Sequence, residues 1–251
     1  MNKHQVPFAR LQKTKRTLCF LLIIFFAKLP SIAQTISFGT GTTFPYGLYA
    51  SKDFNQTSAG LATKGQAYTL VLEDNRKART VNPFIQFTHN TNSIDQNALN
   101  DVYKYIGISF GYRGAQAFKP WAQTLLMGGA RFTYFGDQYE LFAKTGVGMG
   151  WLSTYGYNIY SDTLGFIKFN PLKVNTISLV GGVGTHIYVK SSISILLGYD
   201  FFYASADYGY EKFTVSGNPV RADLAVKVKA PLQVGNFYVG LRLNLARPQK
   251  K

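Results

Sequence analysis

Six ionisable side chains recur in segments where every second residue is apolar, and all six lie on the mixed side of those segments. They are Arg131, Glu140, Lys144, His186, Asp200 and Arg242. An unpaired charge in a low-dielectric interior costs several kcal/mol, so we expect these groups to pair with one another. Charges of mixed sign could relay protons or ions, or they could form a structural network that fixes the register of the segments.

A second candidate chemistry centres on His89, which has Thr88, Thr91 and Ser93 close by in the chain. A histidine within hydrogen-bond reach of a hydroxyl can act as the base that activates a nucleophile. No acidic residue stands at a spacing that would complete such a site. We therefore interpret His89 as a polar rim residue, and we expect no catalytic residue, metal site or cofactor.

The elements that carry these residues have the period of β-strands. In residues 192–204 the odd positions are uniformly apolar and the even positions are mixed, as in a strand whose side chains alternate between two faces. Eight segments are predicted as strands, with the first three less regular than the others: 36–44, 61–72, 81–90, 122–134, 139–151, 175–189, 192–204 and 234–246. The later ones have the length of a tilted strand that crosses a bilayer.

Residues 102–112 are also apolar, but a ninth strand would contradict the even strand counts of bacterial outer-membrane barrels. We therefore place them in a long loop, as a strand extension or a short helix that starts near Asp101.

The connections between strands alternate in length. Residues 73–79, 135–138 and 190–192 form short links, whereas 154–173 and 205–232 are long and rich in Tyr, Gly, Asn and Asp. Short periplasmic turns and long outer loops are typical of a bacterial outer-membrane barrel. At the Gly136-Asp137 turn, a two-residue hairpin would pair Thr133 with Glu140 and leave Arg131 on the diagonal.

The mixed side of the strands favours a membrane barrel over a soluble one. It is dominated by Gly, Ser, Thr and Asn, whereas a solvated face would carry many Lys and Glu residues. Small side chains suit the interior of an eight-stranded barrel, which side chains fill. Aromatic residues fall at two levels that match interfacial girdles: Trp151, Tyr155, Phe201, Tyr203 and Phe237 near the long loops, and Phe132, Tyr134 and Tyr139 near a short turn.

The N-terminus predicts a signal peptide over residues 1–33, followed by one barrel domain over 34–251. Six basic residues and no acid accompany the apolar run 18–27, and Ser31-Ile-Ala33 provides a cleavage site. The apolar run is too short for a membrane helix and contains Cys19, the only cysteine. Without the six basic residues of the leader, the formal charge of +15 falls to +9. The remaining basic residues are scattered, so no nucleic-acid partner is expected.

Three stretches carry a family resemblance: the leader end 31–34, the hairpin 132–142 and the last strand 238–245. With them the chain resembles the small eight-stranded outer-membrane β-barrel proteins, the OmpA/OmpX-like group, and especially the porin-like barrels common in Bacteroidota. The resemblance implies the outer membrane of a Gram-negative bacterium and insertion by the outer-membrane assembly machinery. It also implies an assembly signal formed by Tyr238, Gly240, Leu243 and Leu245, although residues 246–251 replace the usual terminal aromatic.

We expect an all-β, antiparallel up-and-down transmembrane barrel of eight strands that is not an enzyme. Eight strands leave no open channel, which favours a structural plug over an ion path. Binding to a ligand or to an unidentified protein partner would then fall to the loops, where tyrosine offers apolar area and a polar tip. The candidates are Tyr155, Tyr157, Tyr160, Tyr208 and Tyr210, which could equally anchor the barrel at the lipid headgroups.

Basic loop residues could meet outer-membrane lipid and anionic lipopolysaccharide. They are Lys168, Lys212, Arg221, Lys227 and Lys229. The alternatives are a lipid-modifying enzyme built on His89, a narrow porin, or a component of a secretion or transport assembly.

Overall fold

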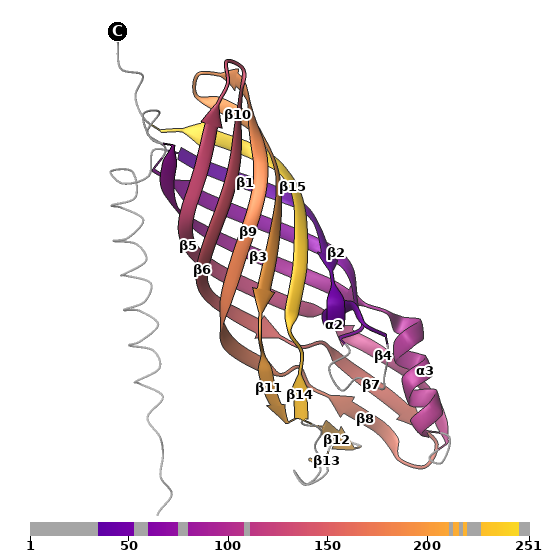
Figure 1. Ribbon diagram of the computed structural model, residues 1–251. Coiled ribbons are helices and arrows are strands. Elements are labelled where there is room, and N and C mark those ends of the chain that lie inside the picture. Colours follow the sequence, from indigo (N-terminus) through magenta and orange to yellow (C-terminus); the bar gives the residue numbers. More distant parts are fainter. Residues whose placement is uncertain are drawn as a thin grey trace, which may run out of the picture.

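Eight antiparallel strands close into a barrel in the computed structural model, and the predicted fold is confirmed (Figure 1). The structure describes residues 35–52, 60–74, 80–107, 111–210, 213–215, 218–219 and 227–245. The barrel strands are β1 (Thr35–Pro45), β2 (Ala62–Glu73), β3 (Val81–Ile94), β5 (Trp121–Phe135), β6 (Tyr139–Ser153), β9 (Lys173–Lys190), β10 (Ile193–Ala204) and β15 (Leu232–Asn244). Each pairs with the next barrel strand along the chain, and β1 closes the barrel on β15. The predicted signal peptide, Lys212, Arg221 and residues 246–251 lie outside the described residues.

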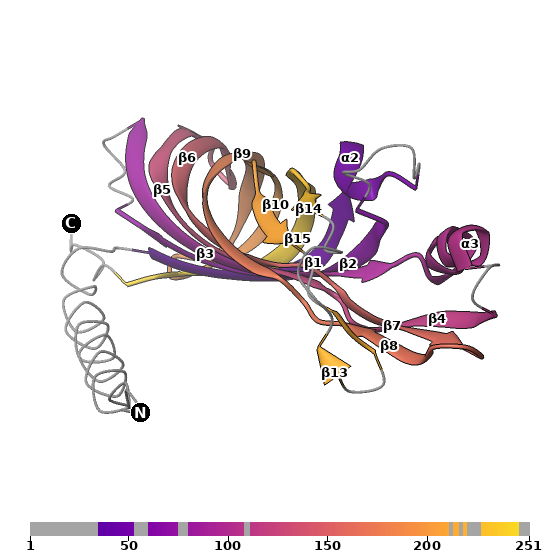
Figure 2. The ribbon, with the colours of Figure 1, turned by 90° about the horizontal axis from the view of Figure 1, so that it is seen from below.

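The long connections at one rim contain secondary structure of their own. They hold α2 (Gly47–Ala50), α3 (Gln96–Gly107), β4 (Tyr112–Lys119), β7 (Gly156–Ser161), β8 (Gly165–Phe169), β11 (Asp207–Tyr210), β12 (Phe213–Val215), β13 (Asn218–Pro219) and β14 (Lys227–Lys229). Strands β4, β7 and β8 continue the wall formed by β5, β6 and β9 and join β12 and β13 in a five-stranded sheet. Figure 2 shows α3 lying over one face of this sheet. Neither described helix combines the length and the apolarity needed to cross a membrane.

The described residues of the segment 102–112 form no ninth barrel strand. Residues 102–107 belong to α3, which starts at Gln96 and not near Asp101, and Tyr112 begins β4. The earlier start is explained by Asp95, whose carboxylate accepts a hydrogen bond from the Ala98 amide at 3.0 Å and forms an ion pair with Lys52. The Ala98 hydrogen bond, followed by the contact with Lys52, lowers the pKa of Asp95 below its ordinary value.

The register of the β5–β6 hairpin differs by two residues from the predicted one. Phe135 pairs with Glu140, and Thr133 stands opposite Phe142. The predicted pairing of Thr133 with Glu140 was therefore wrong, because the two turn residues are Asp137 and Gln138, one position later, and the turn is closed by the Gly136 amide donating to the Tyr139 carbonyl at 2.8 Å. A shift by an even number leaves every side chain on its predicted face.

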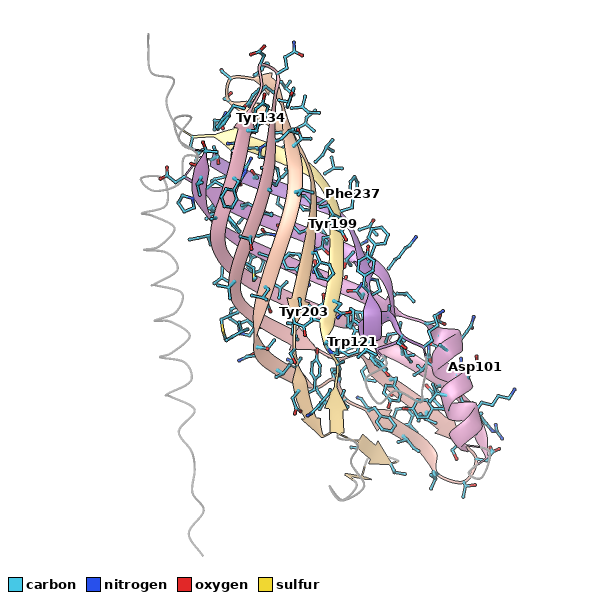
Figure 3. All side chains as sticks on the ribbon, viewed as in Figure 1. Asp101, Trp121, Tyr134, Tyr199, Tyr203 and Phe237 are labelled. Atoms are coloured by element: carbon cyan, nitrogen blue, oxygen red, sulfur yellow. The ribbon has the colours of Figure 1, made fainter. Side chains whose placement is uncertain are left out.

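The apolar side of each barrel strand faces outward, and the polar side is buried inside. The predicted girdle residues other than Tyr155 are exposed on the outer wall: Trp151, Phe201, Tyr203 and Phe237, and Phe132, Tyr134 and Tyr139. Phe237 pairs with Tyr199, four residues before Tyr203 along β10, so it lies between Tyr134 and Tyr203 and not at the level of Tyr203 (Figure 3). Tyr155 was misplaced in the prediction. Thr154 still follows the alternation of β6 and is buried, but the alternation breaks after it and Tyr155 turns inward, with its ring 5.4 Å from that of Trp121.

Glycines inside the barrel make room for large side chains. The Tyr238 ring crosses the lumen between Gly39 and Gly198, and a Cβ at either glycine would overlap that ring. Gly181 lies on the exposed outer wall, where a Cβ would meet nothing within 4 Å. Substitution of a lumen glycine tests packing in the lumen, whereas substitution of Gly181 tests only the general effect of replacing a glycine in a strand.

We predict that Gly198→Ala lowers the free energy of unfolding by about 1–3 kcal/mol, because the new methyl group displaces Tyr238 in a filled interior. Gly181→Ala should be neutral or slightly stabilising. Urea unfolding of both variants in lipid vesicles, followed by tryptophan fluorescence, measures the difference. Equal stability of the two variants would contradict the packing described for Tyr238.

Candidate functional site

Five buried side chains form an arginine cluster at the short-turn end of the lumen. They are Glu73, Arg131, Glu140, His186 and Arg242, which come from strands β2, β5, β6, β9 and β15. Arg131 bridges Glu73 and Glu140, and Arg242 Nη1 donates to the second oxygen of Glu140 at 2.6 Å. Tyr188 also donates to Glu140 at 3.1 Å. The Glu140 carboxylate therefore meets donors from three strands, and the two guanidinium donors are charge-assisted.

His186 is held in one tautomer by this cluster. Its Nδ1 lies 2.8 Å from Arg242 Nη1 and 3.0 Å from Arg131 Nη2. A guanidinium only donates hydrogen bonds, so these two short contacts require Nδ1 to accept, which places the ring proton on Nε2 and makes the longer 3.4 Å approach of Nδ1 to Glu140 Oε1 a contact without a hydrogen bond. The ring also stacks on Phe142, with centroids 5.2 Å apart. Because its acceptor nitrogen is occupied by two arginines, His186 is a structural member of the cluster and is poorly placed to act as a base.

A second network, the lysine cluster, lies beside the first and consists of Gln86, Lys144, Asp200 and Tyr238. Lys144 Nζ is 2.9 Å from Asp200 Oδ2, 2.8 Å from Gln86 Oε1 and 3.2 Å from the Tyr238 hydroxyl. Tyr238 and Gln86 in turn donate to the Asp200 carboxylate at 3.2 and 2.8 Å. Asp200 is tolerated in an otherwise apolar strand because both of its oxygens are bonded.

The two clusters balance in charge. Among the described residues of the lumen, Arg131, Lys144 and Arg242 oppose Glu73, Glu140 and Asp200. The six residues predicted to form a lumen network thus all lie inside the barrel and fall into these two clusters. Sequence reasoning missed Glu73, which was assigned to a turn, and Gln86. In the two-residue alternation, Glu73 lies on the same face as the buried Val71, and Gln86 lies on the same face as the buried Phe84. This alternation was the signal in the sequence that could have placed both residues in the lumen.

Four aromatic rings close the lumen at the long-loop end. Tyr49 from α2, Tyr155 and Tyr208 surround Trp121, with ring centroids 5.1, 5.4 and 5.8 Å from it. We call these four residues the aromatic cap. Burial raises the pKa of Tyr49 and of Tyr208, so both phenols stay neutral. Trp121 also donates from Nε1 to the Gly60 carbonyl at 2.8 Å, which fixes the α2 loop over the opening.

The candidate tyrosines of the loops fall in different environments. Tyr155 and Tyr208 belong to the aromatic cap, and Tyr157 is buried against Phe169, with ring centroids 4.4 Å apart. Tyr160 is exposed, and Tyr210 ends β11. Of the candidate side chains described, only Tyr160 offers an exposed ring to a ligand.

The basic loop residues and the proposed assembly signal are spread over several elements. Lys168 Nζ lies 5.3 Å from the Phe118 ring centroid, Lys229 lies 3.8 Å from Asp207, and Lys227 begins β14. Within β15, Tyr238 points into the lumen, whereas Leu243, like Leu245 just after the strand, is exposed.

His89 and its neighbouring hydroxyl lie on opposite sides of β3. His89 Nδ1 is 3.0 Å from Thr124 Oγ1 across the strand pair, whereas Thr88 is buried in the lumen and bonded to Gln86 at 2.9 Å. Thr88 therefore cannot act with His89, whereas the Thr124 hydroxyl lies within hydrogen-bond reach of it. In the described part of the chain, no group of three or more His, Cys, Asp or Glu side chains is placed to hold a metal ion.

Comparison with known proteins adds evidence on the fold. No family model and no curated protein matches the sequence. A major outer membrane protein from Thermus thermophilus is similar in structure, with 14% identity, 83% of this chain and 98% of that chain covered, and a TM-score of 0.50. The chain has the fold of an outer-membrane β-barrel.

Two further solved structures match less closely. Neisserial surface protein A has 9% identity over 84% of this chain and 96% of its own, with a TM-score of 0.46. The outer membrane protein OprG from Pseudomonas aeruginosa has 13% identity over 84% of this chain and 95% of its own, with a TM-score of 0.43.

We predict that Glu140→Gln destabilises the barrel by about 3–5 kcal/mol, because two buried guanidinium groups lose a shared carboxylate. A matched control is Asp162→Asn, which removes an exposed ion pair with Arg113 and should cost less than about 1 kcal/mol. Equilibrium unfolding in detergent micelles compares the two. A Glu140→Gln barrel as stable as the control would show that the arginine cluster does not hold the strands together.

Proposed function

We propose that the protein is a non-enzymatic integral barrel of a Gram-negative outer membrane, related to the OmpA/OmpX-like and Bacteroidota porin-like barrels, that binds a ligand or partner at its long-loop end. The observation that carries the proposal is a closed barrel with an apolar outer wall and an interior filled by charge-balanced clusters. An apolar outer wall requires a hydrocarbon solvent, and closure leaves no unpaired strand edge in it.

The order of residues along the outer wall supports a membrane. On β6 and β9 the exposed pairs run from Val147/Leu179 and Met149/Ile177 to Trp151/Asn175 and then Ser153/Lys173. Polarity thus rises toward the long-loop rim, with the tryptophan at the boundary, as expected where hydrocarbon gives way to headgroups.

The distance between the two aromatic girdles fits a bilayer. With a rise of about 3.3 Å per residue and a tilt of about 40°, β6 climbs about 30 Å along the barrel axis between Tyr139 and Trp151. The hydrocarbon core of a bilayer is also about 30 Å thick. The part of β6 between Tyr139 and Trp151 therefore has the length needed to cross the hydrocarbon core.

The interior supports a plug and not a pore. An ion that entered from the long-loop rim would meet the aromatic cap first and the lysine and arginine clusters below it. Every charge in these clusters already has a partner of opposite sign, so passage would require breaking buried ion pairs. Binding is thereby left to the outer rim.

We predict that the two tryptophans of the chain respond differently to lipid. Trp151 is 44% exposed on the outer wall and Trp121 is 2% exposed in the aromatic cap. Trp121→Phe leaves Trp151 as the only reporter, and its fluorescence in vesicles should be quenched strongly by lipids brominated near the headgroup. Trp151→Phe leaves the buried Trp121, which should be quenched far less. Equal quenching of the two variants, or none, would contradict the membrane orientation.

We predict no discrete channel openings in a planar bilayer. The wild-type barrel should be silent because three layers block the lumen, and Tyr49→Ala should remain silent because it weakens only the aromatic cap. Single-channel recording at voltages of either sign, with a known porin as the positive control, measures this. Steady openings of the wild-type monomer would favour the narrow-porin alternative.

A further inference from the structure

A groove runs along the outer rim between helix α3 and strand β4. Its volume is about 670 Å³, within the range of small-molecule sites. The lining residues are Gln96, Asn100, Lys104, Tyr112, Arg113, Gly114, Ala115, Gln116, Ala117 and Tyr160. The groove lies outside the barrel, on the rim to which the proposed function assigns binding.

At the floor of the groove, the backbone N–H and C=O groups of β4 already have hydrogen-bond partners within the protein. Gln96 and Asn100, one turn apart on α3, hydrogen-bond the backbone edge of β4. Gln96 Nε2 donates to the Ala115 carbonyl at 2.6 Å, and Asn100 Oδ1 accepts from the Ala115 amide at 2.8 Å. The Ala117 amide donates to Gln96 Oε1 at 3.1 Å. A peptide strand therefore cannot add to β4 at these residues, so the ligand must be recognised by side chains.

One wall of the groove combines open space with an exposed aromatic ring. A Cβ at Gly114 would meet nothing within 4 Å, and Gly114 pairs in register with Tyr160. The Tyr160 ring is 40% exposed, and Phe166 supports it with ring centroids 5.8 Å apart. The electron-rich face of an aromatic ring attracts weakly positive C–H groups, such as those on one face of a sugar ring.

The charged side chains of the groove are cationic. Lys104 and Arg113 line it, and no carboxylate does. Arg113 contacts Asp162 through Nε, and its guanidinium has further N–H donors in a fork that suits carboxylate and phosphate groups. Gln116 adds an exposed amide that can meet hydroxyl groups. Aromatic surface, amide and cations together match a sugar that carries negative charge.

We propose that the α3–β4 groove binds an acidic saccharide, that is, a short stretch of sugar chain with carboxylate or phosphate groups. This inference rests on the proposed function, because it gives the ligand class for the binding rim. The sugar ring lies over Gly114 against Tyr160, and its acid group meets Lys104 and Arg113. Two sources carry this chemistry: the phosphorylated core of lipopolysaccharide and the uronic-acid chains of other surface polysaccharides.

The test uses the full barrel in nanodiscs of zwitterionic lipid. Calorimetric titrations use three probes: phosphorylated core oligosaccharide from deacylated lipopolysaccharide, an oligogalacturonide, and a neutral malto-oligosaccharide. At least one acidic probe should bind, with the neutral sugar weaker by about tenfold or more, because it lacks charge-assisted contacts. The preferred acidic probe identifies the source of the sugar.

Variants link the binding to the groove. Gly114→Val should abolish binding without harming the fold, since the added side chain enters open space. Tyr160→Ala and Lys104→Gln should each weaken binding by about tenfold, and Lys104→Gln should also reduce its salt dependence. The control Lys190→Gln removes an exposed lysine at the short-turn rim, away from the groove, and should bind like the wild type.

Three results would overturn the inference: no binding of either acidic probe, equal binding of the neutral sugar, or wild-type affinity in Gly114→Val and Lys104→Gln. Quenching of Trp151 by brominated lipid in the same samples reports membrane insertion independently. An inserted barrel that binds no acidic sugar refutes the groove assignment alone. A barrel that fails to insert refutes the proposed function.

Discussion

Charges enclosed in the lumen have no bulk water to solvate them, so they must compensate one another across the barrel. Glu140 on β6 meets Arg131 from the neighbouring β5 and Arg242 from β15, which is far away in the sequence. These contacts form only when all eight strands have closed in one register. A slip by one residue in any of these strands would turn its charge toward the lipid and leave its partners buried and unpaired.

The same requirement decides where function can reside. Because the charges of the arginine and lysine clusters are paired with one another, offering them to an ion or a substrate would require breaking buried ion pairs. The aromatic cap adds an apolar layer above them, in which Trp121 anchors the α2 loop. What remains available is the rim, where the barrel wall continues into the β4–β7–β8 sheet beyond the membrane-facing band.

The sequence allowed the barrel to be predicted more fully than its rim. Period-two alternation reports which face a residue occupies, and so it placed Arg131, Asp200 and Arg242 in the lumen. It carries no information on which residues meet across the barrel, because closure sets those contacts. Glu73 was missed because the predicted strand ended one residue too early, and Gln86 was passed over although its parity points inward. In the long loops the alternation is short and interrupted, as at Pro120, so neither β4 nor the inward turn of Tyr155 was predicted.

The groove on the rim follows from how the edge of β4 is covered. A further strand would lie about 4.8 Å away and pack flat, whereas a helix with its side chains is about 10 Å across and stands off the sheet. Gln96 and Asn100 bridge that gap at one level, and space remains beside them over Gly114. Asp95 caps the helix most strongly while it is ionised. Because its pKa is lowered in the folded protein, this contribution is complete above the unfolded value near 4 and is lost as the pH falls through the folded value. At neutral pH the cap is therefore intact, and α3 holds the groove open.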